Sequence, residues 1–206
     1  MSLAVSSDLV GWSSLLSGFV FIISLVFLTL MFSTKTSPWG PLNDVSYVMA
    51  LLLIVPALFG FYRALNATRP AAAAIALILS VSGILIISIT QIRLVLNHIA
   101  FKSNLKQGSF GSGLQGIGFV LFHLVHLQTA TIPEGLVWLG LISGALLALG
   151  IPTSLFYVDE ELEILTGKAD WKKVNKMAVV VMSLTFIGQI GLFAWVIWYG
   201  MHLISL

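Results

Sequence analysis

The sequence predicts an all-α, polytopic transmembrane bundle of six helices that forms one domain over residues 1–206. Its composition carries this prediction: 58% of residues are hydrophobic and only 9% are charged, whereas soluble domains hold roughly 25% charged residues. Several apolar runs also reach the ~20 residues that an α-helix needs to cross the hydrocarbon core, and none alternates like a membrane β-strand. The expected spans cover residues 12–32, 43–63, 71–97, 114–129, 134–157 and 177–203.

Turn-forming residues separate the first three expected helices. The segment STKTSPWGP ends the first, and Asn43 or Asp44 is suited to cap the second because its side chain can accept the free amide hydrogens there. Pro56 predicts a kink in the second helix. The third begins at an AAAA run and holds Arg93 near its end, where the guanidinium can reach the lipid headgroups.

The second half of the chain is expected to begin with a loop. KSNLKQGSFGSG is rich in Gly, Ser and Lys and is interpreted as a connection before the fourth helix. Pro133 and Glu134 open the fifth helix, which carries Pro152 near its end. The polar segment VDEELEILTGKADWKKVNK mixes both charges with apolar residues, so a short amphipathic stretch at the membrane interface is expected between helices five and six.

Six spans place both termini on one side of the membrane, and the positive charges predict which side. Arg63 and Arg69 lie in loops on that side. The opposite side holds Arg93, Lys35, Lys102, Lys106, Lys168, Lys172, Lys173 and Lys176. Cytoplasmic loops are enriched in Lys and Arg, so we predict a multi-pass protein of the cell membrane with non-cytoplasmic termini.

Several classes of function are excluded or disfavoured. The chain has no Cys, which removes disulfides, thiolate catalysis and Cys-ligated clusters. The N-terminal MSLAVSSDLVGW lacks a cationic region, so the first apolar run is expected to be retained rather than cleaved as a signal. A net charge of +2 without an aromatic-interleaved basic patch argues against a nucleic-acid partner.

Small residues recur at helical spacing on the last two expected spans. Gly140, Gly144 and Ala148 lie four residues apart, and the last helix carries Gly188 and Gly191 on one face. Such stripes let helix backbones approach closely in lipid. They predict packing within the bundle, and a homodimer or larger membrane complex stays open as the alternative.

Histidines are the main candidates for a cofactor or metal site. His123 and His126 share one face of the fourth expected helix, and His202 stands near the same end of the last. His126 and His202, with His123 as a substitute, are the pair that could ligate a b-type haem, with Gly188 and Gly191 giving the macrocycle room. The candidate ligands for a metal ion are His123, His126, His202 and Glu134. The default interpretation is that the histidines are interfacial or hydrogen-bonded and that no cofactor binds.

Three other polar residues are candidates for contact with a ligand or lipid. Gln189 lies near the middle of the last expected helix, and an unsatisfied amide in hydrocarbon is costly, so it should face protein or a cavity. Gln115 shares the histidine face, and Arg93 could bind a headgroup. No ionisable residue is found at mid-depth, which weakens ion-coupled transport.

Three segments carry a resemblance: GWSSLLSG, GPLNDVSYVMALLLIVPALFGFYRAL and FAWVIWYGMHL. In organisation they resemble a broad family of prokaryotic six- or seven-helix integral membrane proteins of unknown function. The likeness implies the fold and supplies no catalytic residues. Where relatives place a cation after the terminal Gly, this chain has Met201 and His202.

The absence of convergent acids, bases and nucleophiles argues against intrinsic catalysis. The sequence therefore favours a membrane protein that is either an accessory subunit or a binder of a lipid or another apolar molecule, with membrane lipids as its partners. A cavity lined by Gln189 would favour the binder. The alternatives are a haem- or metal-binding redox protein and a small, dimeric or monomeric transporter, for which Pro56 and Pro152 would mark corresponding helices of two halves.

Overall fold

A computed structural model describes residues 7–34, 38–128, 132–166 and 174–205. The helices are α1 (Ser7–Thr34), α2 (Trp39–Asn66), α3 (Pro70–Val95), α4 (Phe101–His126), α5 (Glu134–Ala148), α6 (Gly150–Phe156), α7 (Val158–Leu165) and α8 (Lys176–Ile204). The described residues contain no strand. Six helical segments, with α5 and α6 counted as one over residues Glu134–Phe156, are long and apolar enough to cross a membrane. The predicted all-α multi-pass bundle is thereby confirmed.

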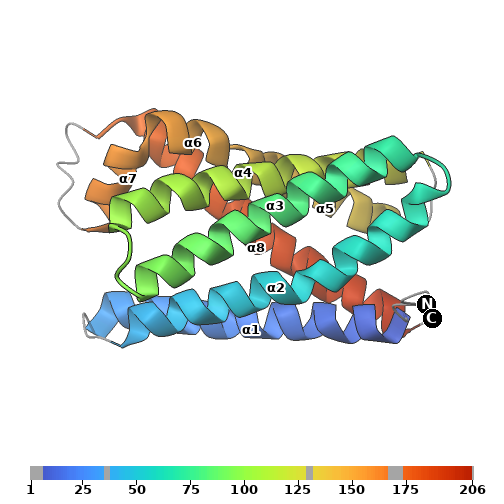
Figure 1. Cartoon of the computed structure of the whole chain (residues 1–206), viewed down its shortest axis with the longest axis horizontal. Coiled ribbons are helices and arrows are strands. Elements are labelled where there is room, and N and C mark those ends of the chain that lie inside the picture. The colour runs from blue at the N-terminus through green and yellow to red at the C-terminus, as the bar shows by residue number, and fades with distance from the viewer. Residues whose placement is uncertain (1–6, 35–37, 129–131, 167–173, 206) are drawn as a thin grey trace.

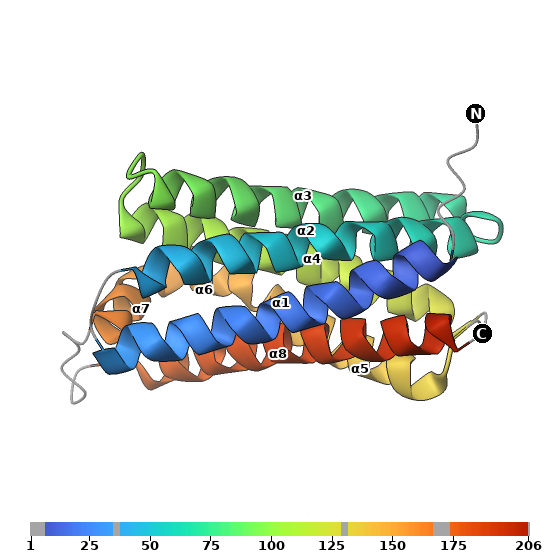
Figure 2. The same cartoon turned by 90° about the horizontal axis from the view of Figure 1, so that it is seen from below.

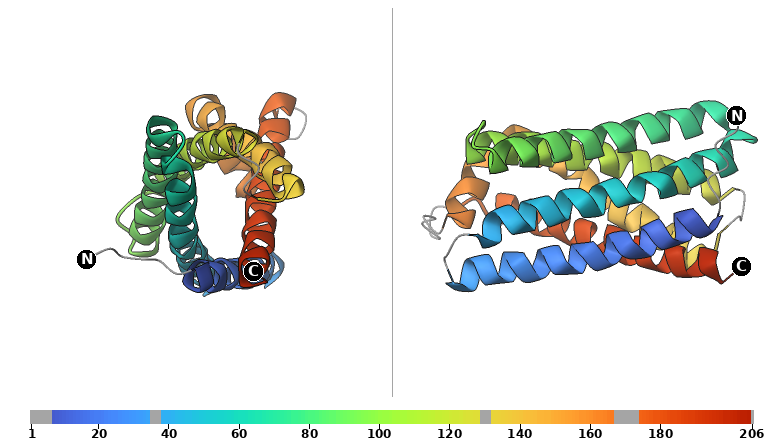
Figure 3. Two further views of the ribbon diagram at one scale, coloured as in Figure 1. Left: turned by 90° about the vertical axis from the view of Figure 1, so that its right-hand side faces the viewer. Right: turned by 60° about the horizontal axis from the view of Figure 1, so that its bottom comes forward.

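The six spans form a ring. Contacts link α1 to α2, α2 to α3, α3 to α4, α4 to α5, α5 to α8 and α8 back to α1, and Figure 3 (left) shows this arrangement along the bundle axis. Helix α6 packs on α4, while α7 packs on α4 and α8. The short α6 and α7 lie at the end of the bundle opposite the two termini (Figure 1).

The expected loop KSNLKQGSFGSG is instead the first half of α4, which begins at Phe101 rather than near residue 114. Its glycines allow α3 and α4 to touch backbone to backbone. A Cβ placed on Gly118 would lie 2.6 Å from the carbonyl oxygen of Ala76, and one on Gly111 would lie 2.8 Å from that of Gly83. In lipid, close contact between helices compensates the poor helix propensity of glycine, so the segment is helical.

Several other boundaries also differ from the expected ones. Helix α1 begins at Ser7, five residues before the expected start, and α2 begins at Trp39 instead of 43. Pro56 lies inside α2, which continues to Asn66. The first part of the amphipathic stretch expected between the last two spans is the separate helix α7, Val158–Leu165, and residues 167–173 of that stretch lie outside the described residues. The lysines at 35, 168, 172 and 173 fall outside the described residues.

The small-residue stripes are used inside the chain. A Cβ on Gly188 would meet Leu146 Cβ at 2.7 Å, and one on Gly144 would meet the carbonyl oxygen of Gly116 at 2.9 Å. A Cβ on Gly191 would collide with the Ser143 hydroxyl. Helix α5 is therefore packed between α4 and α8 along the two stripes that the sequence singled out.

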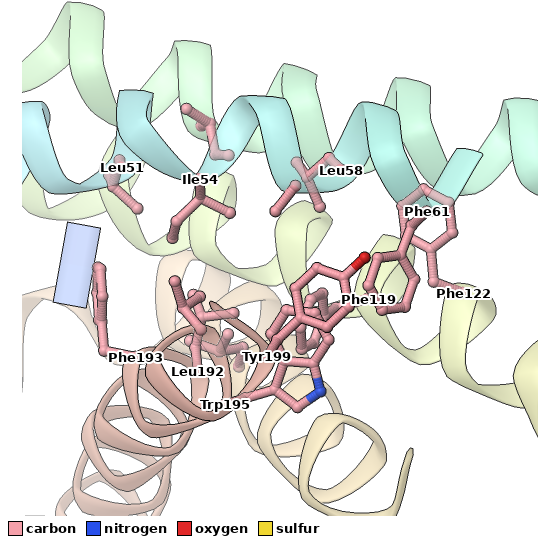
Figure 4. Packing of buried hydrophobic residues seen from close by; sticks show 14 of the residues in the cluster. Leu51, Ile54, Leu58, Phe61, Phe119, Phe122, Leu192, Phe193, Trp195 and Tyr199 are labelled. Atoms are coloured by element: carbon pink, nitrogen blue, oxygen red, sulfur yellow. The ribbon is translucent and has the colours of Figure 1, made fainter. Parts of the chain in front are cut away.

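The buried core fills the middle of the ring and its termini-side half. Figure 4 shows Leu51, Ile54, Leu58 and Phe61 of α2 facing residues of α8 across this core. The largest side chain that is fully buried there is Trp195, whose indole Nε1 donates to the carbonyl oxygen of Leu136 at 2.9 Å. Helix α8 is thereby attached to the first turn of α5.

Both chain ends lie at one end of the bundle (Figures 1 and 2). A Cβ on Gly11 of α1 would lie 2.7 Å from Ile204 near the end of α8. Arg69 belongs to this end and donates to Gln128 Oε1 at 3.3 Å. The opposite end, which we call the lysine-rich end, carries Lys102, Lys106 and Lys176 among the described residues.

Candidate binding cavity

A cavity of about 270 Å³ opens inside the ring toward the lysine-rich end. Its lining comes from α1, α2, α3, α4, α6, α7 and α8. More than half of the lining side chains are polar: Ser24, Asn43, Tyr47, Gln91, Asn104, Ser109, Ser112, Thr153, Glu161, Thr185 and Gln189. The apolar remainder includes Phe21, Leu25, Ile87 and Met182. A hollow lined by both polar and apolar groups is thus the dominant feature of this half of the molecule.

Buried amide side chains in the lining lack partners. Asn104 is 5% exposed and Gln189 is 8% exposed, and neither Asn104 Oδ1 nor Gln189 Nε2 has a hydrogen-bond partner among the described residues. The same holds for Gln91 Oε1 on α3. A buried amide without a partner costs about 1–3 kcal/mol. Helices α3, α4 and α8 therefore each place an amide in the lining to which a guest in the cavity could form a hydrogen bond.

Glu161 brings a carboxylate to the cavity from α7. Its Oε2 accepts a hydrogen bond of 3.5 Å from the Ser109 hydroxyl of α4. Burial raises the pKa of Glu161 from its ordinary 4.5 to about 7, although the Ser109 bond acts in the opposite direction. Helix α7 packs on α4 and α8, and the exposed side chains of Lys102 and Asp159 form an ion pair between α4 and α7.

The inner end of the cavity is closed by aromatic rings. Phe21 of the lining stacks on Phe193 of α8 with ring centroids 3.7 Å apart and an interplanar angle of 8°. Tyr47 contacts both rings at 6.3 and 6.5 Å. We call the rings of Phe21, Tyr47 and Phe193 the aromatic floor. Gln189 lies one helical turn before Phe193 on α8, so its amide is next to this floor.

The two α4 histidines lie beyond that floor, inside an aromatic cluster on the termini side. His123 Nδ1 is 2.7 Å from the carbonyl oxygen of Phe119, so it is the ring nitrogen that donates a proton. The His123 ring meets Trp195 edge-on at 5.1 Å, and that of His126 meets Phe61 at 4.6 Å. Both histidines are buried, and Gly140 of α5 leaves the space in which the His123 ring lies.

The remaining candidates for a haem or metal site are spread over the structure. His202 is half-buried in the last turn of α8, and Glu134 is exposed and accepts from Trp138 Nε1 at 3.2 Å. No group of three His, Cys, Asp or Glu side chains within the described ranges is placed to hold a metal ion. The space that the haem hypothesis assigned to Gly188 and Gly191 is filled by α5. The haem and metal assignments stay predictions.

The three predicted ligand contacts fall in different places. Gln189 lines the cavity. Gln115 is buried on the α3–α4 seam, where its backbone nitrogen would lie 2.6 Å from a Cβ on Gly83. Arg93 is exposed near the lysine-rich end. The sequence reasoning missed Asn104, Ser109 and Glu161, because it placed the first two in a loop and the third at the interface.

A second, shallower cavity of about 240 Å³ lies at the termini end. It is lined by Ser7, Val10, Gly60, Arg63, Tyr199 and Leu203. Tyr199 stacks on Trp195 with centroids 4.8 Å apart, so the aromatic cluster separates this hollow from the main cavity.

Comparison of the chain with protein-family models, curated proteins and solved structures gives no match.

Proposed function

We propose that this multi-pass membrane protein acts without intrinsic catalysis and binds a small molecule with hydrogen-bonding groups in the cavity at its lysine-rich end. The observation that carries the proposal is a pair of nine-tenths buried amides in the lining of one cavity, whose Asn104 Oδ1 and Gln189 Nε2 find no hydrogen-bond partner among the described residues. Buried polar groups are normally hydrogen-bonded. A guest whose donors and acceptors match these amides would take over the hydrogen bonds that water makes to them in its absence.

The lining also sets the size and polarity of the guest. A volume of 270 Å³ corresponds to about nine water molecules at roughly 30 Å³ each, and drug-sized ligands occupy pockets of about 300–1,000 Å³. The guest is therefore smaller than a typical drug. Since the lining mixes polar and apolar side chains, we propose a polar or amphipathic molecule that is smaller than the lipid favoured by the sequence.

Thermal unfolding with small probe molecules tests this function. Ethanolamine, acetamide and acetate each fit the cavity and differ in charge. A ligand that binds only the folded state raises the Tm, so at least one probe should raise it in the wild type. In Gly108→Trp the indole should fill the cavity and abolish the shift, because no atom lies within 4 Å of a Cβ at this lining position.

Phe110→Trp is the matched control. Phe110 lies two residues further along α4 and is 39% exposed on the outside of the ring, so the probe-induced shift should persist in this variant. If no probe raises the wild-type Tm, or if Gly108→Trp responds as fully as the control, the cavity does not bind small molecules and the proposal is wrong.

Transport is the second candidate, and the two opposite cavities favour it. They are separated by the Phe21–Phe193 stack and the aromatic cluster around Trp195. A transport cycle would have to open these layers in turn. If the protein transports its guest, proteoliposomes should accumulate a probe that binds in the Tm assay, and Gly108→Trp should not. Binding without accumulation would leave the protein a binder.

The accessory-subunit function and the haem- or metal-binding redox function stay predictions as well. A stoichiometric partner that copurifies in mild detergent would support the first. A Soret band or bound metal that disappears in His126→Ala and His202→Ala would support the second.

A further inference from the structure

The donors and acceptors of the cavity are unequally distributed. A hydroxyl group has one donor and two acceptor positions. Ser24 donates to Asn43 Oδ1 at 2.8 Å, Thr153 donates to the Leu149 carbonyl oxygen at 2.9 Å, and Thr185 donates to that of Val181 at 2.9 Å. Their donors are used within the protein, so these hydroxyls can offer a guest only acceptors.

Carboxylates add negative charge to the same surface. Glu161 lines the cavity, and its Oε2 accepts a hydrogen bond from the Ser109 hydroxyl. On the α2 side, Asn43 lines the cavity and its Nδ2 donates to Asp44 Oδ1 at 3.3 Å. The carboxylate of Glu161 on α7 thus lies in the lining. The carboxylate of Asp44 on α2 lies behind the lining residue Asn43.

No lysine, arginine or histidine is among the residues that line the cavity in the described part of the chain. Helix α7 packs against α4, α6 and α8. The charged groups of these neighbours near Glu161 are Lys102, which pairs with Asp159, and the exposed Lys106 and Lys176, while α6 carries no charged residue. Glu163, further along α7, is exposed. Among the described residues, Glu161 therefore has no cationic partner within the cavity.

We infer that the cavity takes a small organic cation of the ammonium type, with Glu161 as its counter-charge. The inference rests on the proposed binding function and names the class of its ligand. The ammonium group would donate to the hydroxyl oxygens of the lining and to Asn104 Oδ1 and Gln91 Oε1, and a hydroxyl or another acceptor on the same molecule would accept from Gln189 Nε2. The faces of Phe21 and Tyr47 in the lining can also attract a cation.

Binding of the cation would be linked to a proton. Since burial raises the pKa of Glu161 to about 7, a large share of the empty protein holds this carboxyl in the neutral form near neutral pH. A cation favours the ionised form, so its entry would release the Glu161 proton to the surrounding water. Affinity for the cation should therefore rise as the pH rises through 7.

The absence of Cys from the whole sequence permits a direct test with one introduced thiol. Gly108→Cys places the thiol on the cavity lining, where a Cβ meets no atom within 4 Å. The probes are the trimethylammonium-ethyl and the sulfonato-ethyl methanethiosulfonates, which differ in charge. The ratio of their rates, normalised to a free thiol in solution, cancels the ionisation of the cysteine itself.

We expect the cationic reagent to react about tenfold faster or more at pH 8.5, and the ratio to fall toward one at pH 5.5. In Gly108→Cys with Glu161→Gln, the preference and its pH dependence should largely disappear. Ser112→Cys, which also lines the cavity, repeats the measurement at a second position if the first variant folds poorly.

The outcomes separate this inference from the proposed function. If the uncharged hydroxyethyl reagent labels Gly108→Cys rapidly but the charged reagents show no preference, or if Glu161→Gln keeps the preference, the cavity stands and the cationic ligand is wrong. If none of the reagents labels either position, the binding function fails together with the inference.

Discussion

Close contact between α3 and α4 predicts a large difference between two glycine-to-alanine substitutions. At Gly83 of α3 the new methyl group would lie 2.6 Å from the backbone nitrogen of Gln115 and against the carbonyl oxygen of Gly111. Non-bonded heavy atoms reach contact at about 3.5 Å. Both neighbours are backbone atoms, so no side chain can turn aside and the helices must separate by about 1 Å. Gly108 of α4 has no atom within 4 Å of the same methyl group.

Overpacking of this kind costs about 1–3 kcal/mol, and each 1 kcal/mol lowers the Tm of a 150–250-residue protein by roughly 2–4 °C. We therefore expect Gly83→Ala to lower the Tm by roughly 2–12 °C, and Gly108→Ala to change it by no more than about 2 °C. The six tryptophans allow unfolding in detergent to be followed by intrinsic fluorescence. Equal Tm values for the two variants, or a larger loss of Tm in Gly108→Ala, would refute the close backbone contact between α3 and α4 at Gly83.

Three further predictions follow from named contacts. Because burial raises the pKa of Glu161 to about 7, the folded protein holds a proton that the unfolded chain releases above about pH 4.5. The Tm should thus fall as the pH rises from about 4.5 to 7, and this part of the fall should be missing in Glu161→Gln. Trp195→Phe removes the 2.9 Å hydrogen bond to the first turn of α5 and should lower the free energy of unfolding in detergent by about 1–3 kcal/mol. Trp198 is 42% exposed, so the control variant Trp198→Phe should lower it by under about 0.5 kcal/mol. In sealed vesicles, an impermeant thiol reagent should label Lys106→Cys only from the cytoplasmic side and Arg69→Cys only from the other side; the reverse pattern would show that the termini face the cytoplasm.

The fold class could be predicted from the sequence because the membrane requirement is local. A span must be about 20 apolar residues long whatever its neighbours are, and Gly140, Gly144, Gly188 and Gly191 showed by spacing alone where helices meet. The start of α4 could not be read in the same way. Gly and Ser break helices in water, so KSNLKQGSFGSG has the composition of a loop. The seven-residue interval between Gly111 and Gly118, two turns of one helix face, was the available signal.

The candidate site was predicted only in part because it depends on long-range packing. Gln189 stands out as a strong polar residue in the middle of an apolar helix, and the structure places it in the cavity lining. The role of Glu161 depends on the turn at Tyr157 between α6 and α7, which brings α7 against α4 and α8. Within an amphipathic segment of mixed charge, no local pattern distinguishes the carboxylate that faces a cavity from those that face water.

If the protein binds a small molecule from water, the hollow beside Asn104 and Gln189 must be open to such molecules. The most direct measurement compares the labelling rates of Gly108→Cys and Phe110→Cys by the uncharged hydroxyethyl methanethiosulfonate in native membranes. The two positions lie at nearly the same depth on α4, one on the cavity lining and the other on the outer surface of the ring. A thiol in lipid stays protonated and unreactive, so we predict rapid labelling of Gly108→Cys and slow labelling of Phe110→Cys. Equal rates, or faster labelling of Phe110→Cys, would contradict it.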